Sequence, residues 1–214
     1  MHIFILIFVT FIGNSITFAK VDMSRTLASI KRVGHARELM GNCYKKSIVS
    51  TFEKNNKLEA NILATIVSRL PKKFKKQAKS ISHAIFNEAK KHGMDPYFVM
   101  AVISGESSFN PLAIGPVDEI GMMQLRPATG KWMAERIKFK WKGNKTLRDP
   151  VANIKLGTAY LAWLREKFDN HGQLYLAAYN MGPKSVKNAL IKNVWPKDYP
   201  IHVMKRYLAF YKSI

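Results

Sequence analysis

The sequence predicts an all-α protein, and three observations support this class. Apolar residues recur at intervals of three and four along most of the chain, which is the spacing of one helix face. Asp–Pro pairs and single glycines stand where such segments would begin and end. No stretch alternates apolar and polar residues convincingly, so we expect at most a small hairpin near residues 112–126.

Residues 20–79 predict a basic, helical N-terminal region. Its clearest helix places Leu58, Ile62, Ile66 and Leu70 on one face, and Pro71 ends it. A lysine-rich connector follows the proline, and we draw the region boundary after residue 79. Three roles stay open for this region: packing on the rest of the chain, recruiting a partner, or adding affinity for an anionic surface. We expect the last of these, because basic residues outnumber acidic ones there.

Residues 80–214 predict a second helical region. Gly93 closes its first helix, and the pairs Asp95–Pro96 and Asp149–Pro150 cap two more. Gly157 lies on the apolar face of the 150–168 helix. Because glycine has no side chain, we expect another helix to approach closely there. The expected helices are 80–92, 96–107, one opening at residue 127, 150–168, 173–180, 185–192 and 201–212.

Residues 1–19 have the pattern of a secretory signal peptide. The apolar run from Ile3 to Ile12 has the length of a signal core, and Thr17 and Ala19 precede a possible cleavage point. The run is short for a membrane span, although an uncleaved anchor is the alternative. We therefore expect export, with no stable membrane insertion after the signal is removed.

The composition excludes several function classes. Lys and Arg number 35 against 14 Asp and Glu, a formal net charge of +21, which favours a polyanionic partner. We expect no nucleic acid, because the basic residues lack interleaved aromatics or a recognition motif. Cys43 is the only cysteine, so no intramolecular disulfide forms, and the six histidines lack a metal-ligand spacing. We expect no metal and no cofactor, and the oligomeric state stays open.

One carboxylate stands on the apolar face of the 96–107 helix. Glu106 follows Val99, Val102 and Ile103 by seven, four and three residues, so it continues their stripe. Burial disfavours the anion and raises a carboxyl pKa, which suits a general acid near neutral pH. The position alone equally allows a glutamate at a frayed helix end that turns to water.

Four ordered blocks, "ESSFNP", "GMMQLRPATG", "NIKLGTAYL" and "AAYNMGP", resemble the soluble lytic transglycosylases over about residues 80–212. The resemblance implies a lysozyme-like (goose-type lysozyme/SLT) catalytic domain with a helical N-terminal extension. It implies cleavage of the β-1,4 bond between N-acetylmuramic acid and N-acetylglucosamine in peptidoglycan strands. The reaction would proceed without water and leave 1,6-anhydromuramoyl ends. It also implies a bacterial protein in the periplasm or at the cell wall.

The same resemblance implies the site residues. Glu106 matches the single catalytic acid/base, and Gln124 matches a position that lines the glycan cleft, with Met123 beside it. Tyr179 matches a tyrosine whose hydroxyl lies near the catalytic carboxyl. Asn180 follows it as a substrate-binding candidate, and we expect it also to brace the next turn.

The sequence departs from the family pattern between the first two blocks. Gly115 stands where many members have a serine whose hydroxyl supports the catalytic glutamate. Asp118 and Glu119 replace small residues, and we expect both to face solvent without a catalytic role, although a nearby anion could raise the Glu106 pKa. Asn153 opens the third block, and we expect its role to be structural.

Two other functions stay open on the sequence alone. A hydrolytic muramidase on the same fold would use a second carboxylate and water, whereas a lone Glu106 would rely on the muramoyl 6-hydroxyl. A non-catalytic wall-binding protein with a degenerate site is the other alternative. Product mass separates the first two, and turnover of purified peptidoglycan separates both enzymes from the binding protein.

Overall fold

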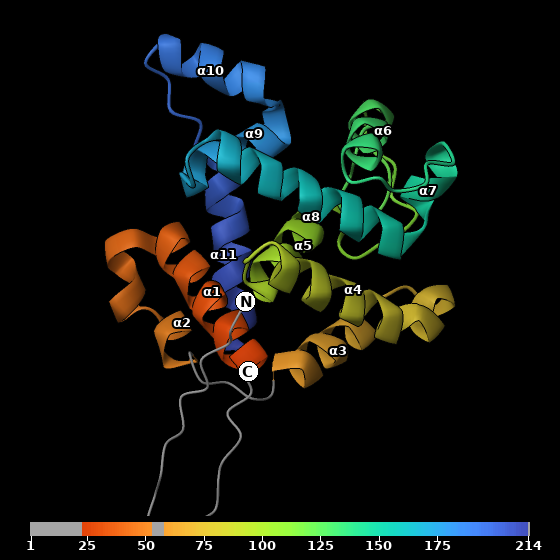
Figure 1. Cartoon of the computed structure of the whole chain (residues 1–214), viewed down its shortest axis with the longest axis horizontal. Coiled ribbons are helices and arrows are strands. Elements are labelled where there is room, and N and C mark those ends of the chain that lie inside the picture. The colour runs from red at the N-terminus through yellow and green to blue at the C-terminus, as the bar shows by residue number, and fades with distance from the viewer. Residues whose placement is uncertain (1–22, 53–57, 214) are drawn as a thin grey trace, which may run out of the picture.

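The computed structural model describes residues 23–52 and 58–213, and the signal peptide expected at residues 1–19 lies outside them. In these ranges the secondary structure is helical apart from isolated β-bridges, such as those joining Ile120 to Ile114 and to Leu125. This confirms the all-α class and the small hairpin. The helices are α1 Met23–Met40, η1 Gly41–Lys46, α2 Ile48–Thr51, α3 Leu58–Arg69, η2 Lys72–Gln77, α4 Ala78–Lys91, α5 Pro96–Ser107, α6 Pro127–Arg136, α7 Asn144–Arg148, α8 Pro150–Lys167, α9 Gly172–Met181, α10 Pro183–Ile191 and α11 Asp198–Lys212 (Figure 1).

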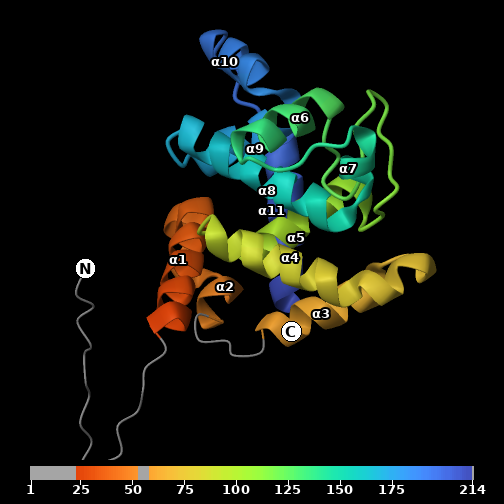
Figure 2. The same ribbon diagram turned by 45° about the vertical axis from the view of Figure 1, so that its right-hand side comes forward.

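Helix α5 runs through the centre of the molecule. The Asp95 side chain caps it by accepting a hydrogen bond from the Tyr97 N–H at 2.9 Å, and Pro96 occupies the first turn. Every residue from 96 to 103 is buried, as expected of a helix that is apolar on all sides. Helix α11 packs along it, with α4 on another side. Figure 2 shows α1–α3 on one side of α4 and α5, and α6–α10 on the other.

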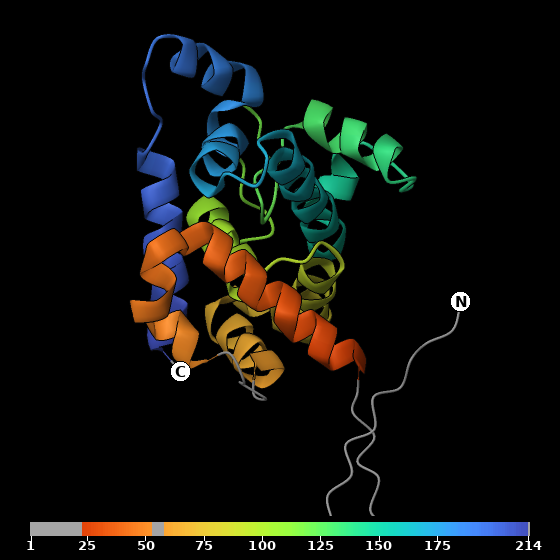
Figure 3. The same cartoon turned by 60° about the vertical axis from the view of Figure 1, so that its left-hand side comes forward.

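The N-terminal helices pack directly on the C-terminal ones. Helix α3 contacts α4, α2 contacts α11, and α1 contacts α4 and α9 (Figure 3). Val49 and Ile66 belong to the same buried cluster as Phe98 and Tyr211. Of the three roles left open for residues 20–79, packing is therefore the one the described residues show. The boundary after residue 79 stays a prediction, as does wall affinity.

Gly157 of α8 meets a different neighbour from the one expected. A Cβ placed there would lie 2.5 Å from the sulfur of Met123 and 2.8 Å from its Cβ. Met123 belongs to the loop between α5 and α6, so the expectation that a helix approaches Gly157 is wrong. The loop enters the core at this point because Met123, which is fully buried, fills the space over the glycine.

Candidate active site

Glu106 occupies the last turn of α5 and is partly buried. Its Oε1 accepts a hydrogen bond from the hydroxyl of Tyr199, a residue in the first turn of α11. Burial raises the pKa of Glu106 to about 7; the Tyr199 hydrogen bond opposes this shift, the charge of Glu119 adds to it, and Arg206 opposes it. The carboxyl can therefore hold a proton near neutral pH and release it to a substrate.

Tyr199 is a residue of the candidate site that the sequence did not predict. Burial, and then the charge of Glu106, raise the pKa of its phenol well above the ordinary value, so it stays protonated and donates. The two residues are 93 positions apart. The signal in the sequence is only a tyrosine before Pro200 at the start of the last helix, and no local pattern connects that position to α5.

Tyr179 of α9 lies near Glu106 but donates its hydrogen bond elsewhere. Its hydroxyl donates to the carbonyl oxygen of Met123 at 2.7 Å. Burial raises its pKa well above the ordinary value, and the charge of Glu106 contributes next. The expected position of the Tyr179 hydroxyl near the carboxyl stays a prediction, and the hydrogen bond to Glu106 comes from Tyr199.

The loop between α5 and α6 is held under the site by Asn153. The buried side chain of Asn153 accepts from the Met123 N–H at 2.8 Å and donates to the carbonyls of Ile120 and Leu147 at 2.8 and 2.9 Å. Its expected structural role is confirmed. The Ser107 hydroxyl, next to Glu106, donates to the Met122 carbonyl at 2.8 Å and so joins this loop to the end of α5.

The other three residues expected to contact substrate are Gln124, Met123 and Asn180, and they lie in different environments. Gln124 is partly exposed, and its amide donates to the carbonyls of Ala113 and Gly121 at 3.1 and 2.9 Å. The Met123 side chain is fully buried, so it would reach a substrate only if the loop opened. Asn180 is exposed beside Tyr179. The turn after Asn180 is closed by a backbone hydrogen bond from the N–H of residue 182 to the carbonyl of residue 178. This bond, and not the Asn180 side chain that we expected to brace the turn, holds it.

Residues 115–119 form a tight turn at the edge of the site. The Gly115 N–H donates to the Glu119 carbonyl at 2.8 Å, and the Asp118 N–H donates to the Gly115 carbonyl at 3.3 Å. Asp118 is exposed as expected, but Glu119 is partly buried and its Oε2 accepts from the Val117 N–H at 3.1 Å. The expectation that both acids face solvent is therefore wrong for Glu119, because its side chain folds back over the turn.

A row of aromatic rings extends from Tyr179 towards the surface. Tyr160 lies 5.6 Å from Tyr179 between ring centroids and stacks on Trp163 at 5.9 Å. Trp132 of α6 contacts Trp163 at 4.8 Å and is 38% exposed. Aromatic faces of this kind can pack against the apolar faces of sugars.

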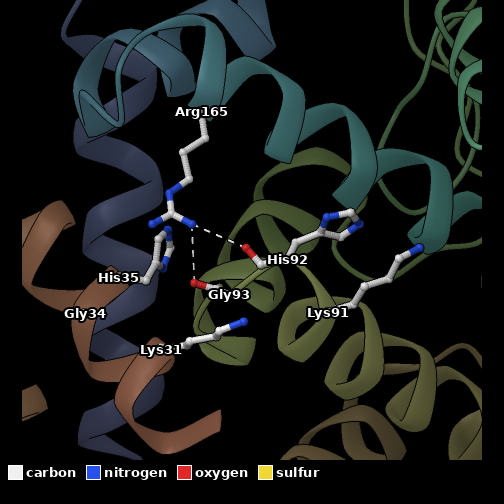
Figure 4. A pocket seen from close by; sticks show the side chains of 7 residues that line it. All are labelled: Lys31, Gly34, His35, Lys91, His92, Gly93 and Arg165. Carbon is white, nitrogen blue, oxygen red and sulfur yellow. Dashed lines mark hydrogen bonds between the residues drawn. The ribbon is translucent and has the colours of Figure 1, made fainter. Parts of the chain in front are cut away.

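A hollow lined mainly by basic residues lies at the opposite end of α5, where α1, α4 and α8 meet (Figure 4). Arg165 points into it, but its guanidinium is engaged by Glu38 at 2.5–3.0 Å and by the carbonyls of His92 and Gly93. His35 bonds the Asp95 N–H and the Tyr175 hydroxyl, both at 3.1 Å. Arg165 and His35 are therefore already bonded to the protein at this junction.

No group of three or more His, Cys, Asp or Glu side chains that could hold a metal ion is present in 23–52 and 58–213. Within the same ranges, none of the helices has both the length and the apolar character needed to cross a membrane.

A family model described as the transglycosylase SLT domain matches residues 83–201, more than half of the chain. A putative soluble lytic murein transglycosylase of Haemophilus influenzae is 42% identical over 89 residues, which are 42% of this chain and 15% of that protein. The membrane-bound lytic murein transglycosylase C of Cronobacter sakazakii is 27% identical over 154 residues, 68% of this chain and 42% of that protein. The chain therefore spans less than half of these relatives.

Two solved structures share the fold. The 70 kDa soluble lytic transglycosylase of Escherichia coli superposes with a TM-score of 0.53 at 22% identity, over 78% of this chain and 31% of that one. An inactive mutant of the lytic transglycosylase Slt from Pseudomonas aeruginosa gives 0.55 at 23% identity, over 91% of this chain and 38% of that one. At these identities the likeness supports the fold alone, and it confirms the lysozyme-like all-α class.

Proposed function

Because the chain belongs to the transglycosylase SLT domain family, we propose that it is a peptidoglycan lytic transglycosylase. It cleaves the β-1,4 bond between N-acetylmuramic acid and N-acetylglucosamine and leaves 1,6-anhydromuramoyl ends. The observation that carries this proposal is Glu106, a carboxyl at the end of α5 with a pKa of about 7 and a hydrogen bond from Tyr199.

Glu106 performs both proton transfers. The protonated carboxyl donates to the glycosidic oxygen as the bond to C1 breaks, which releases N-acetylglucosamine with a new hydroxyl. The resulting carboxylate takes the proton of the muramoyl 6-hydroxyl, whose oxygen closes on C1. This intramolecular attack has a high effective concentration, so no positioned water is needed. Tyr199 holds Oε1, which leaves Oε2 to face the sugar.

The substrate strand contacts the aromatic row beside Tyr179. Trp132 is partly exposed there, and two cations lie over the indole rings: Arg136 over Trp132 at 5.9 Å and Lys167 over Trp163 at 4.8 Å. The exposed part of Trp132 suits the apolar face of a sugar, and the two cations suit the carboxylates of the wall. The partner is therefore the glycan strand of peptidoglycan.

The protein acts outside the cytoplasm, in the periplasm or at the cell wall. The support is the signal-like pattern of residues 1–19 and the net charge of +21, which suits an anionic wall. A fusion of residues 1–30 to alkaline phosphatase tests export, since this reporter is active only after translocation. The same fusion lacking residues 1–19 should stay inactive, and equal activity of the two would refute export.

Product mass tests the reaction. Purified peptidoglycan digested by the full chain should give muropeptides lighter by one water than lysozyme products. Glu106→Gln should give none, whereas Glu166→Gln, an exposed glutamate on α8, should behave as wild type. Products with reducing ends would instead indicate a hydrolytic muramidase. Binding without any product would indicate a wall-binding protein.

A further inference from the structure

Residues 191–195 cover the end of α10 and the start of its link to α11, and all five are exposed. Three of them are large apolar residues: Ile191, Val194 and Trp195 have exposed fractions of 80%, 56% and 54%. Figures 1 and 3 show this segment at the outer edge of the molecule. A folded protein seldom exposes such residues as a group, so their clustering marks an interaction surface.

The turn after α10 holds these side chains in a defined arrangement. Asn193 adopts a left-handed backbone with φ of 55°, and the Val194 N–H donates to the Ala189 carbonyl at 2.9 Å, which folds the chain back over the helix end. The ring centroids of Trp195 and His171 lie 5.7 Å apart. The three apolar side chains are therefore presented by a hydrogen-bonded turn that packs against the start of α9.

Positive charge surrounds the three apolar residues. Residues 183–197 include four lysines and neither Asp nor Glu; the next acid along the chain is Asp198. On α10, two of these lysines precede Ile191 by four and seven positions, so they lie on the same side of the helix. All four lysines are exposed: Lys184, Lys187, Lys192 and Lys197. We name these lysines, together with Ile191, Val194 and Trp195, the apolar–basic patch.

The loop between α5 and α6 carries exposed apolar residues beside the opposite charge. Leu112, Ile114 and Val117 are exposed there, and two acids, Asp118 and Glu119, follow directly. The exposed apolar residues of the patch are thus accompanied by lysines, whereas those of the loop are accompanied by carboxylates. The two surfaces therefore suit partners of opposite charge.

The chemistry of the patch selects among three occupants. A glycan strand packs its sugar faces on aromatic rings, and Ile191 and Val194 offer no ring. A second copy of the chain would bring the same lysines face to face across a two-fold axis, against a net charge of +21 on each copy. At a lipid bilayer, apolar side chains enter the headgroup region, tryptophan is favoured at that depth, and lysines bind anionic headgroups. An anionic bilayer fits all three features of the patch.

We propose that the apolar–basic patch is a peripheral docking surface for an anionic lipid bilayer. Ile191, Val194 and Trp195 enter the boundary between headgroups and acyl chains, while the lysines contact lipid phosphates. The protein lies on the bilayer in this role and does not span it. The patch contains none of the residues assigned to the reaction, so docking is a property separate from the proposed glycan cleavage.

Cosedimentation with lipid vesicles tests the docking. The whole chain is compared with the chain lacking residues 1–19, because the apolar run of those residues would bind lipid by itself. The shorter chain should bind vesicles of phosphatidylglycerol and phosphatidylcholine in equal parts, and should bind phosphatidylcholine alone far more weakly. Ile191→Ser should weaken its binding to the anionic vesicles roughly tenfold. Ile114→Ser is the matched control, because it removes an exposed isoleucine that lies beside acids, and it should bind as wild type does.

The contribution of charge is tested by removing lysines in two places. The variant Lys187→Gln/Lys192→Gln/Lys197→Gln removes three charges from the patch and should weaken binding roughly hundredfold at low salt. Its matched control lowers the net charge equally, by removing three exposed lysines of α7 and the segment before it: Lys138→Gln/Lys140→Gln/Lys145→Gln. Because charges further than about 10 Å from the lipid are screened, this control should stay within roughly threefold of wild type.

Tryptophan fluorescence reports the contact at the patch directly. Anionic vesicles should shift the emission of the shorter chain to shorter wavelength, because Trp195 leaves water. Trp195→Phe should lose this shift, whereas Trp132→Phe, which removes the exposed tryptophan of the aromatic row, should keep it. Thermal unfolding of every variant checks the fold.

Several results would overturn the proposal. The shorter chain could bind anionic and neutral vesicles equally, Ile191→Ser or the patch lysine variant could bind as wild type, or the two lysine variants could lose binding equally. Weaker binding of the patch variants to purified peptidoglycan, with unchanged vesicle binding, would make the patch a glycan surface. A dimer that Ile191→Ser dissociates, without vesicle binding, would make it a contact between copies. Glu106→Gln should bind vesicles as wild type does, so the docking and the proposed reaction fail independently.

Discussion

Asp95 and Glu106 lie at opposite ends of α5 and differ in how many partners surround them. Asp95 is fully buried and accepts from the Tyr97 N–H at 2.9 Å and from the hydroxyls of Tyr207 and Tyr211 at 2.9 and 2.5 Å. Arg32 of α1 lies 3.8 Å from it. Within the described residues, Glu106 receives one hydrogen bond, from Tyr199.

Burial raises the pKa of both carboxyls, yet the consequences differ. The partners of Asp95 oppose the shift, first the charge of Arg32 and then the two tyrosine hydroxyls. These three groups lie at Oδ2, and the backbone N–H of the α5 first turn donates to Oδ1. Asp95 therefore joins α1, α5 and α11, and both of its oxygens accept hydrogen bonds. Among the residues that the structure describes, none donates a hydrogen bond to the second oxygen of Glu106, so the carboxyl proton can be transferred. A buried carboxyl stabilises a fold when both of its oxygens accept hydrogen bonds from the protein. It can serve catalysis when one oxygen is left for a substrate.

The largest expected effect is on turnover at the Glu106 end. Glu106→Gln removes the transferable proton, so turnover should fall by at least the roughly 10²- to 10⁴-fold that general acid catalysis contributes. The amide can still accept from the Tyr199 hydroxyl, so the melting temperature should not fall. Turnover on purified peptidoglycan and thermal unfolding measure the two properties. Wild-type turnover in this variant would show that Glu106 does not transfer the proton, and the contrast with Asp95 would fail.

At the Asp95 end the expected effect is on stability. Asp95→Ala leaves Arg32 facing a buried site without its carboxylate and leaves two tyrosine hydroxyls without acceptors. The free energy of unfolding should fall by about 3–5 kcal/mol. Urea denaturation measures this loss. Turnover per folded molecule should stay near wild type, and a specific loss of turnover without loss of stability would contradict the structural role.

The pH dependence of stability should also separate the two ends. The folded-state pKa of Glu106 is raised from 4.5 to about 7, so the folded state binds more protons between these values. Stability is therefore full below pH 4.5 and declines as pH rises through 7. Glu106→Gln removes this decline, so its stability relative to wild type should grow by up to about 2 kcal/mol between pH 5 and 8. Urea midpoints at several pH values measure it, and a constant difference would show that burial does not set the Glu106 pKa.

The smallest expected effect concerns the tyrosines. Tyr199→Phe removes a hydrogen bond that lowers the Glu106 pKa, so the high-pH limb of turnover should move up, by roughly half a pH unit. Tyr207→Phe is the matched control: it removes one hydrogen bond from Asp95 and should cost about 1 kcal/mol of stability without moving the limb. Equal pH profiles for wild type and Tyr199→Phe would show that Tyr199 does not affect the Glu106 pKa.

The helices and the position of the Glu106 carboxyl could be predicted from the sequence. Asp–Pro pairs at 95–96 and 149–150 cap α5 and α8 as expected, because capping depends on residues within one helical turn. The periodicity that places Glu106 in line with Val99, Val102 and Ile103 is equally local. The burial that raises the Glu106 pKa does not follow from one stripe, because every residue from 96 to 103 is buried by the helices packed around α5. Helix α7 was missed because its five residues are too few to show a period.

Only the tertiary structure decided which groups surround that carboxyl. Tyr199 reaches Glu106 across 93 residues because α11 packs along α5, and the Glu119 carboxylate lies over Gly115 because the glycine leaves room for it. The role of the N-terminal helices was likewise decided by packing, through contacts of Arg32 and His35 with residues far along the chain. Such contacts depend on how whole helices pack, and no pattern within a few neighbouring residues encodes them. The sequence by itself therefore determined which carboxyl we propose as the acid, and the fold determined the environment of that carboxyl.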